Sequence, residues 1–294
     1  MPRKNVSVIL TTFNGAVYIK KQIESILNQT VPPDEIIVCD DNSTDDTVFK
    51  LNSFLDKRIK VFVNTTQLGV VENFKKAATL AQPGNWLAFA DQDDIWQPQK
   101  LNRLIDAMHL IDDGKTPSLI YSDLAVIDKN DDVISPSFWG KQKIFPEKIR
   151  LATLLYGNVV TGCTTLINYS MAEEFFCMEN NVYLHDEWLS LIAYSFGRVK
   201  FLKEKLVLYR QHENNITFSE NYKIPGIIGA IKDNFNYLIK KKKFLSHQFG
   251  LAKAFLLQYR HKLDNKQIRT VENFLKLERK NYLVQRINRL ITYL

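Results

Sequence analysis

The sequence predicts an α/β protein, in which helices flank a mixed, mainly parallel sheet and a helical region follows at the C-terminal end. Three observations predict this fold. Short and almost wholly apolar runs, typical of strands covered on both faces, recur along the first half of the chain. Stretches with apolar residues at helical spacing alternate with these runs, and acidic loops follow two of them. At 294 residues, the chain is long enough for one large α/β domain or for a domain with an appendage.

The first half of the chain predicts strands and helices in alternation. Predicted strands cover Val6–Leu10, Glu35–Cys39, Ile59–Asn64 and Trp86–Ala90, and predicted helices lie within Tyr18–Leu27, Phe49–Leu55, Glu72–Ala81 and Lys100–Ile111. The first helix ends before Pro32 and Pro33, because proline lacks the N–H that a helix interior needs. This order of elements is typical of a doubly wound parallel sheet.

The second half of the chain predicts a less regular mixture of elements. Ser118–Tyr121 is expected to form a strand, and Val126–Ile134 a hairpin that turns at Lys129–Asp132. Pro136–Pro146 has no clear period, which predicts a loop over the site. The remaining predictions are helices at Leu151–Tyr156, Ala172–Cys177 and Leu184–Ala193, a β-like segment at Asn158–Asn168, and strands at Val199–Leu202 and Lys205–Tyr209.

The cysteines and the apolar runs indicate a cytoplasmic protein. Cys39, Cys163 and Cys177 form no CxxC pair, and the first two lie in apolar surroundings, which is typical of small core residues in a reducing compartment. The apolar run Val6–Leu10 is too short for a signal peptide, and no run approaches the ~18 residues that a membrane span needs.

Charge divides the chain into two predicted domains. Residues 1–223 hold 24 basic and 28 acidic side chains, whereas residues 224–294 hold 15 and 4. The net positive charge therefore belongs to the second part, which we expect to be a basic helical region with a partner of its own.

Two acidic loops follow predicted strands. Asp91, Asp93 and Asp94 come directly after Trp86–Ala90, and Asp40–Asp46 follows the second strand. One interpretation of the first loop is an acidic turn that caps the helix beginning near Pro98. The other is a metal–diphosphate site at the carboxyl edge of the sheet, because residues two apart in an extended chain face the same way. Three carboxylates, and a second acidic loop at the same edge, favour the metal site.

Phosphate-binding loops of two common classes are absent from the sequence. The turn after the first strand has no GxGxxG fingerprint, which argues against a dinucleotide-dependent dehydrogenase. The chain also has no GxxxxGK[ST] loop, which argues against a P-loop NTPase.

Two further polar groups are candidates for catalysis or metal binding. Asp186 stands at the start of an apolar helical face, either as an N-cap or as a general base, and Glu187 is the second choice for the base. His212 lies among polar residues after the last strand, either as a structural histidine or as a ligand.

Four motifs in order carry a resemblance to a known family. They are Ser7-Val-Ile-Leu-Thr-Thr-Phe-Asn14, Val38-Cys-Asp-Asp-Asn-Ser-Thr-Asp-Asp-Thr47, Asp91-Gln-Asp-Asp-Ile-Trp96 and His185-Asp-Glu-Trp188. Over about the first three quarters of its length, the chain resembles the family-2 inverting glycosyltransferases, which have the Rossmann-like GT-A fold. The Asp91 and His185 motifs look most like those of bacterial rhamnosyltransferase-type members.

The resemblance implies a nucleotide-binding role for five residues. Thr11 and Phe13 would line the nucleobase pocket, and Asp41 would accept a hydrogen bond from the pyrimidine N3–H. Asp91 would approach the ribose, and Asn73 would border the nucleotide. The implied donor is a nucleoside-diphosphate sugar, with dTDP-rhamnose as the sugar nucleotide of the rhamnosyltransferase-type members.

The resemblance also implies the reaction and its metal. Asp93 would ligate Mg²⁺ or Mn²⁺ and bridge it to the diphosphate, with His212 as a further ligand, while Asp186 would be the catalytic base. The acceptor would be a hydroxyl of a cell-surface polysaccharide precursor, commonly lipid-linked in such pathways. The alternative is a catalytically inert nucleotide-sugar-binding or scaffold protein of the same fold. A nucleotidyltransferase is disfavoured because Thr11–Gly15 contains no basic residue.

The basic tail leaves three interpretations open. It could pack as a helical cap on the body or on a second copy in a homodimer, or lie on a membrane surface as an amphipathic helix. Nucleic-acid binding is disfavoured, because no stacking platform or recognition motif accompanies the basic charge. The last helix carries an apolar stripe of Leu283, Ile287, Leu290, Ile291 and Leu294. A membrane-bound tail would make the protein peripheral on the inner face of the plasma membrane.

Overall fold

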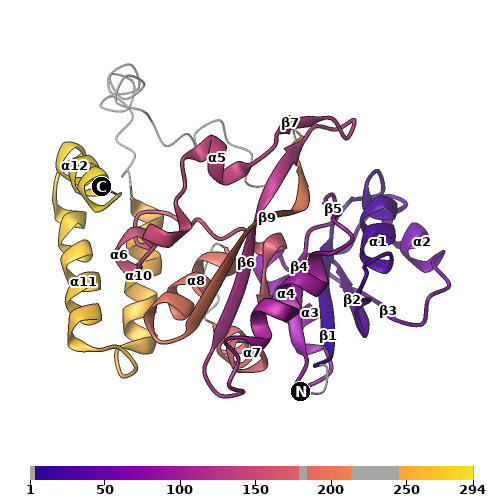
Figure 1. Cartoon of the computed structure of the whole chain (residues 1–294), viewed down its shortest axis with the longest axis horizontal. Helices are drawn as coiled ribbons and strands as arrows, with labels where there is room; N and C mark the ends of the chain where they lie inside the picture. The colour runs from indigo at the N-terminus through magenta and orange to yellow at the C-terminus, as the bar shows by residue number, and fades with distance from the viewer. Residues whose placement is uncertain (1–3, 179–183, 213–244, 294) are drawn as a thin grey trace.

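The computed structural model describes residues 4–178, 184–212 and 245–293, and one sheet runs through its centre (Figure 1). The strand order is β3-β2-β1-β4-β8-β6-β9-β5, and β7 pairs with β6 outside this path. The strands are β1 (Val6–Thr12), β2 (Glu35–Asp40), β3 (Ile59–Val63), β4 (Trp86–Ala90), β5 (Ile95–Trp96), β6 (Ser118–Ile127), β7 (Val133–Ser135), β8 (Leu166–Ile167) and β9 (Arg198–Arg210).

Helices surround this sheet and continue beyond one end of it. The helices of the body are α1 (Ile19–Leu27), α2 (Thr47–Asn52), α3 (Val70–Thr79), α4 (Lys100–His109), α5 (Phe138–Gln142), α6 (Leu151–Leu154), α7 (Tyr169–Phe176) and α8 (His185–Ser195), with short 3₁₀ turns η1 (Pro146–Lys148) and η2 (Gly162–Thr164). The C-terminal helices are α10 (Ser246–Tyr259), α11 (Asn265–Lys276), the 3₁₀ turn η3 (Leu277–Arg279) and α12 (Tyr282–Tyr293).

The mainly parallel sheet that the sequence predicts is confirmed. β1, β2, β3 and β4 are parallel neighbours, with Thr12 opposite Asp40 and Leu10 opposite Ala90. β8 is antiparallel to both β4 and β6, β9 runs parallel to β6, and β5 is antiparallel to β9. Because the parallel strands end at one edge, the loops that begin at Asp41 and Asp91 leave the sheet at the same edge, on either side of β1.

Both faces of the central strands are buried, which explains their continuous apolar sequences. Along β1, Val8 and Leu10 face the core formed with α1 and α4, whereas Ile9 faces the core formed with α3, α7 and α8. Ile9, Val8 and Leu10 are fully buried. Successive side chains of a strand point to opposite faces, so a strand between two helical layers must be apolar at every position.

The C-terminal helices pack against the body at the end far from α1 and α2 (Figure 1). Trp188 of α8 meets Phe255 edge-on at 5.7 Å between ring centroids, and Tyr259 lies at the same centroid distance. Phe249 and Phe274 belong to the same apolar core as the central strands. The proposed domain boundary between residues 223 and 224 lies outside the described residues.

Three local predictions are wrong. Pro136–Pro146 contains α5 and η1 instead of an open loop, because Trp139 is buried in the core and Ser137 caps the helix. Asn158–Asn168 forms η2 and the two-residue strand β8, not a longer strand. The two predicted strands at the end of the body are one strand, β9, whose register against β6 shifts near Leu202.

No helix within the described ranges combines the length and the apolar character that would let it cross a membrane.

Candidate functional site

A cavity of about 1080 Å³ opens where the parallel strands end. It is lined by residues from the loops after β1, β2 and β4, from α3, from the starts of η2 and α8, and from the segment after β9. All eight residues that the sequence analysis named for the site line this cavity: Thr11, Phe13, Asp41, Asn73, Asp91, Asp93, Asp186 and His212. Residues up to about 200 positions apart in the sequence thus share one cavity.

The turn before α3 holds the carboxylate of Asp41 in place. Its Oδ1 accepts hydrogen bonds from Asn64 Nδ2 at 2.8 Å and from the Leu68 N–H at 2.7 Å, and its Oδ2 accepts from the Gly69 N–H at 2.9 Å. Gly69 adopts φ +82°, a left-handed conformation that favours glycine. An ionised carboxylate offers about four acceptor positions, so Asp41 keeps capacity for one more donor.

Asn64 connects Asp41 to the helix that borders the cavity. Its Nδ2 also donates to Asn73 Oδ1 at 2.9 Å, and its Oδ1 accepts from Lys76 Nζ at 2.7 Å. Asn73 in turn donates to the Cys39 carbonyl of β2 at 2.9 Å. The network fixes Asn73 and Asp41 relative to each other before any ligand binds.

Gln92, between the first two aspartates of the acidic loop, positions Phe13. The Phe13 N–H donates to Gln92 Oε1 at 2.8 Å, and Gln92 Nε2 donates back to the Phe13 carbonyl at 3.1 Å. A Cβ at Gly15 would lie 2.2 Å from the same Oε1, so a larger residue there would displace the Gln92 side chain from Phe13. Phe13 is 42% exposed and lines the cavity. No pattern in the sequence pointed to Gln92.

Asp93 and His212 meet at the cavity wall. His212 Nε2 lies 2.8 Å from Asp93 Oδ2, and the imidazole stacks on Tyr18 with ring centroids 5.1 Å apart. Burial raises the pKa of Asp93, and the bond to His212 opposes this effect. Two cis ligands at ~2.1 Å from an octahedral Mg²⁺ lie about 3 Å apart. The spacing and the oxygen and nitrogen donors therefore fit a divalent cation held by these two side chains.

The fully buried Arg210 joins the loop after β4, which contains Asp93, to the end of β9, which leads to His212. Its main-chain N–H donates to Asp94 Oδ1 at 3.1 Å, and its Nε donates to the Asp93 carbonyl at 2.8 Å. Its Nη1 reaches the Asp128 carbonyl at 2.8 Å, and the guanidinium lies 4.6 Å from the Tyr18 ring centroid. No pattern in the sequence indicates this role, because Arg210 is a single basic residue at the end of a strand.

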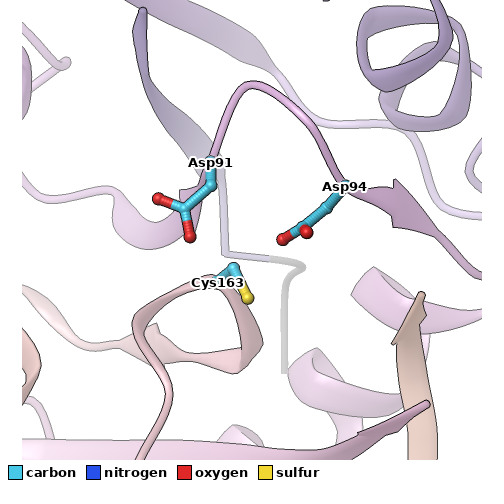
Figure 2. Close-up of side chains that lie close together, drawn as sticks. All are labelled: Asp91, Asp94 and Cys163. Carbon is cyan, nitrogen blue, oxygen red and sulfur yellow. The ribbon is translucent and has the colours of Figure 1, made fainter. Parts of the chain in front are cut away.

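The three aspartates of the acidic loop divide between two environments. Asp91 and Asp93 both line the cavity, as alternation predicts, but the loop bends after β4 and the two side chains have different neighbours. Asp91 lies with Asp94 and Cys163, and the ligand atoms of these three residues are all within 4.8 Å of one another (Figure 2). Burial and the neighbouring Asp93 charge raise the pKa of Asp91 to about 7. Cys163 is buried, as predicted, but it faces acids as well as apolar side chains.

A buried lysine lies under this cluster. Lys100 Nζ donates to the Cys163 carbonyl at 2.5 Å and stands 3.2 Å from the centroid of the Trp96 ring. Burial lowers the pKa of Lys100 to about 7, and the charges of Asp94 and Asp91 oppose this effect. The N-cap of α4 is Gln99, so none of the three aspartates caps that helix.

Asp186 stands in the first turn of α8 and faces the cavity. The N-cap of α8 is Leu184, so Asp186 does not have the capping role that the sequence left open. Its Oδ2 accepts a hydrogen bond from the Gly162 N–H at 3.0 Å, and its Oδ1 is buried with no partner among the described residues. Burial and then the Glu187 charge raise the pKa of Asp186 to about 7, a value suited to a group that accepts a proton near neutral pH.

The two residues on either side of Asp186 have different surroundings. Glu187 lies outside the cavity lining and is bonded to His247 Nε2 at 2.5 Å, which removes it as the second choice for the base. His185 lines the cavity and packs on Phe74 at 4.3 Å between ring centroids. A Cβ at Gly162 would lie 2.8 Å from His185 Nε2, so glycine at this position leaves room for the imidazole.

The family model and the relatives that match this chain are all described as glycosyltransferases. The sequence model described as "Glycosyl transferase family 2" matches residues 7–176. An Escherichia coli protein named UDP-Glc:alpha-D-GlcNAc-diphosphoundecaprenol beta-1,3-glucosyltransferase WfgD is 34% identical over 191 residues, which cover 64% of this chain and 69% of that protein. The dTDP-rhamnosyl transferase RfbG of Shigella flexneri is 28% identical over 245 residues, covering 74% and 78%.

A solved structure matches the fold along almost the whole chain. S. aureus TarS, in complex with UDP-GlcNAc, gives a TM-score of 0.58 at 18% identity, and the match covers 98% of this chain and 90% of that one. At this identity, the likeness concerns the fold, and it extends over the C-terminal helices as well as the body.

Proposed function

This chain belongs to glycosyl transferase family 2 and takes its sugar from a nucleotide-sugar donor, and we propose that it is a metal-dependent inverting enzyme. The acceptor in this proposal is a hydroxyl of a lipid-linked precursor of a cell-surface polysaccharide. The observation that carries the proposal is the single cavity lined by Asp41, Asp93 and Asp186. In this proposal, Asp41 recognises the nucleobase, Asp93 binds the diphosphate through the metal, and Asp186 accepts the proton.

In the proposed reaction, Asp186 accepts the proton of the acceptor hydroxyl as that oxygen attacks the anomeric carbon. One carboxylate is sufficient, because the nucleoside diphosphate leaves without needing the acid that a glycosidase supplies. The Gly162 N–H orients the carboxylate by holding Oδ2, and Oδ1 is the oxygen left to take the proton.

Asp93 and His212 would hold Mg²⁺ or Mn²⁺ beside the donor. When bound, the ion supplies positive charge that stabilises the departing diphosphate. Arg210 keeps Asp93 and the segment leading to His212 in register through its bond to the Asp93 carbonyl. Asp91, which lines the same cavity, would approach the ribose of the donor.

The base of the donor is proposed to be uracil or thymine, and the sugar rhamnose. Asp41 retains acceptor capacity, which matches the N3–H that uracil and thymine share. RfbG, which is similar to this chain, is named as a dTDP-rhamnosyl transferase, and WfgD is named for UDP-Glc.

Thermal shift with a donor panel tests this assignment. With Mn²⁺ present, we expect dTDP-rhamnose at 100 times its Kd to stabilise the fold by about 2.7 kcal/mol, which shifts Tm by several degrees. GDP-sugars should give no shift, because guanine presents two adjacent donors, N1–H and N2–H2, where Asp41 keeps capacity for one, and because a purine is larger than a pyrimidine. A larger shift with UDP-glucose would contradict rhamnose as the sugar, and a shift with GDP-sugars alone would contradict the role of Asp41.

We also propose that α12 attaches the enzyme to the membrane that holds its acceptor, on the inner face of the plasma membrane. Leu283, Ile287, Leu290 and Ile291 of this helix lie on one stripe, and each is between 46% and 64% exposed. Arg279 and Lys280, directly before α12, are exposed. A basic residue near an anionic membrane surface contributes about 1 kcal/mol of attraction, and the apolar stripe adds burial in the interface. Leu294, the last member of the predicted stripe, lies outside the described residues.

Vesicle flotation tests the membrane proposal on the full chain. We expect the parent protein to float with phosphatidylglycerol-containing vesicles, and the variant Ile287→Gln/Leu290→Gln/Ile291→Gln to stay at the bottom. Leu257→Gln is the matched control, because Leu257 is 78% exposed on α10 and lies outside α12. Equal flotation of parent and triple variant would refute the proposal, and loss of a dimer in sedimentation would assign the stripe to a second copy.

A further inference from the structure

An ion pair between a half-buried histidine and a buried glutamate links the C-terminal helices to the residue beside the proposed base. Glu187 follows Asp186 directly on α8, and its side chain is only 3% exposed. His247 is the second residue of α10, and its Nε2 lies 2.5 Å from Glu187 Oε2. Neither side chain lines the cavity, so a direct contact with donor or acceptor does not explain the pair.

Two carboxylates act on the ionisation of Asp186. Glu187 on its own helix and Asp91 after β4 both disfavour the ionised form, and Glu187 has the larger effect. The main-chain N–H groups of Gly162 and Glu187 favour the ionised form. The charge of Glu187 is compensated by His247, because their hydrogen bond raises the pKa of His247 and so keeps the imidazole protonated to higher pH.

We infer that His247 is a positioning residue for the transfer reaction, which acts on Asp186 through Glu187. The imidazolium neutralises Glu187, and this lowers the repulsion that the base experiences when it ionises. The C-terminal helix α10 therefore influences the ionisation of the proposed base, although no residue of α10 lines the cavity. This inference rests on the proposed role of Asp186 as the base.

The test is the pH profile of kcat/KM for variants of the full chain. His247→Gln keeps a hydrogen-bond donor and removes the charge, and we expect it to move the acidic limb up by about one pH unit, which is about a tenfold loss of activity at a pH below the limb. His247→Ala should move the limb in the same direction. Glu187→Gln should move it down, because it removes the like charge beside Asp186. The plateau above the limb should change little in all three.

His261→Ala is the matched control, because His261 is exposed in the same C-terminal region and should leave the limb in place. An unmoved limb in folded His247→Gln and Glu187→Gln, with lowered Tm alone, would overturn the inference and leave a purely structural pair. If His247→Ala does not fold, His247→Gln and Glu187→Gln still test the inference.

A second measurement separates this inference from the proposed function. The infrared carboxyl signal of Asp186, obtained as the difference from Asp186→Asn, can be titrated without any substrate. His247→Gln should shift this titration to higher pH and Glu187→Gln to lower pH. A parent chain that transfers no sugar would overturn the proposed function, while the infrared titration would still support or overturn the effect of His247.

Discussion

Replacing Asp186 with Asn is expected to lower the rate of sugar transfer by about 10²–10⁴-fold, the usual contribution of a positioned general base. The amide keeps the size of the carboxyl group and can still accept the Gly162 N–H, but it cannot take a proton. Donor affinity should stay within about twofold, because Asp186 acts on the acceptor. Transfer kinetics at saturating donor, together with calorimetric binding of the donor, measure the two effects separately.

The same substitution should raise Tm at pH 8. Because the pKa of Asp186 is raised from 3.8 to about 7 in the fold, burying the ionised form costs stability as pH increases from the unfolded value to the folded value. Below pH 3.8, the group is protonated in both states and this cost disappears. A shift of this size corresponds to at most about 4 kcal/mol, and Asn removes the cost at high pH.

Asp106→Asn on the exposed face of α4 is the control for both measurements. We expect it to change neither transfer nor the pH dependence of Tm. Loss of donor affinity in folded Asp186→Asn would reassign Asp186 to donor binding. Retention of more than about a tenth of the transfer rate would exclude it as the base.

The second large effect is expected at the proposed metal site. A chelator should abolish transfer, and Mg²⁺ or Mn²⁺ should restore it. Asp93→Asn should reduce transfer by about 10²–10³-fold, a typical loss when one group that stabilises the leaving charge is removed. His212→Ala should act in the same direction, because both side chains meet at 2.8 Å and fit one cation.

Binding of Mn²⁺, followed by electron paramagnetic resonance in the presence of a nucleoside diphosphate, gives a readout that needs no turnover. The parent chain should bind the ion, and Asp93→Asn should bind it at least tenfold more weakly. His261→Ala is again the control, because it removes an exposed histidine that lies outside the cavity lining. Full transfer activity in metal-free buffer would contradict the metal role of both residues.

The sequence predicted at which edge of the sheet the acidic loops lie, but it did not predict which side chains each aspartate contacts. The acidic loops after β2 and β4 were predicted to share an edge, because parallel neighbouring strands end together. Within the second loop, Asp91 and Asp93 both line the cavity, but Asp91 lies with Asp94 and Cys163 whereas Asp93 contacts His212, and alternation alone does not give these different neighbours. Alternation applies to an extended chain, and the loop bends immediately after β4.

The sequence by itself determined the layered fold and the edge of the sheet at which the cavity lies. Short runs that are apolar at every position are typical of strands covered on both faces, and the polar residues that directly follow such strands are then expected at the edge of the sheet. These constraints are local, so they are readable without coordinates.

Only the tertiary structure decided which distant groups meet at that rim. Gly162 holds the Asp186 carboxylate, Arg210 binds the loop that contains Asp93, and His247 reaches Glu187 from α10. Each contact joins segments separated by 24 to 117 residues. Such contacts depend on how helices pack on the sheet and where β9 ends, and no spacing in the sequence encodes them. The surroundings of the proposed proton acceptor are therefore a property of the packed molecule.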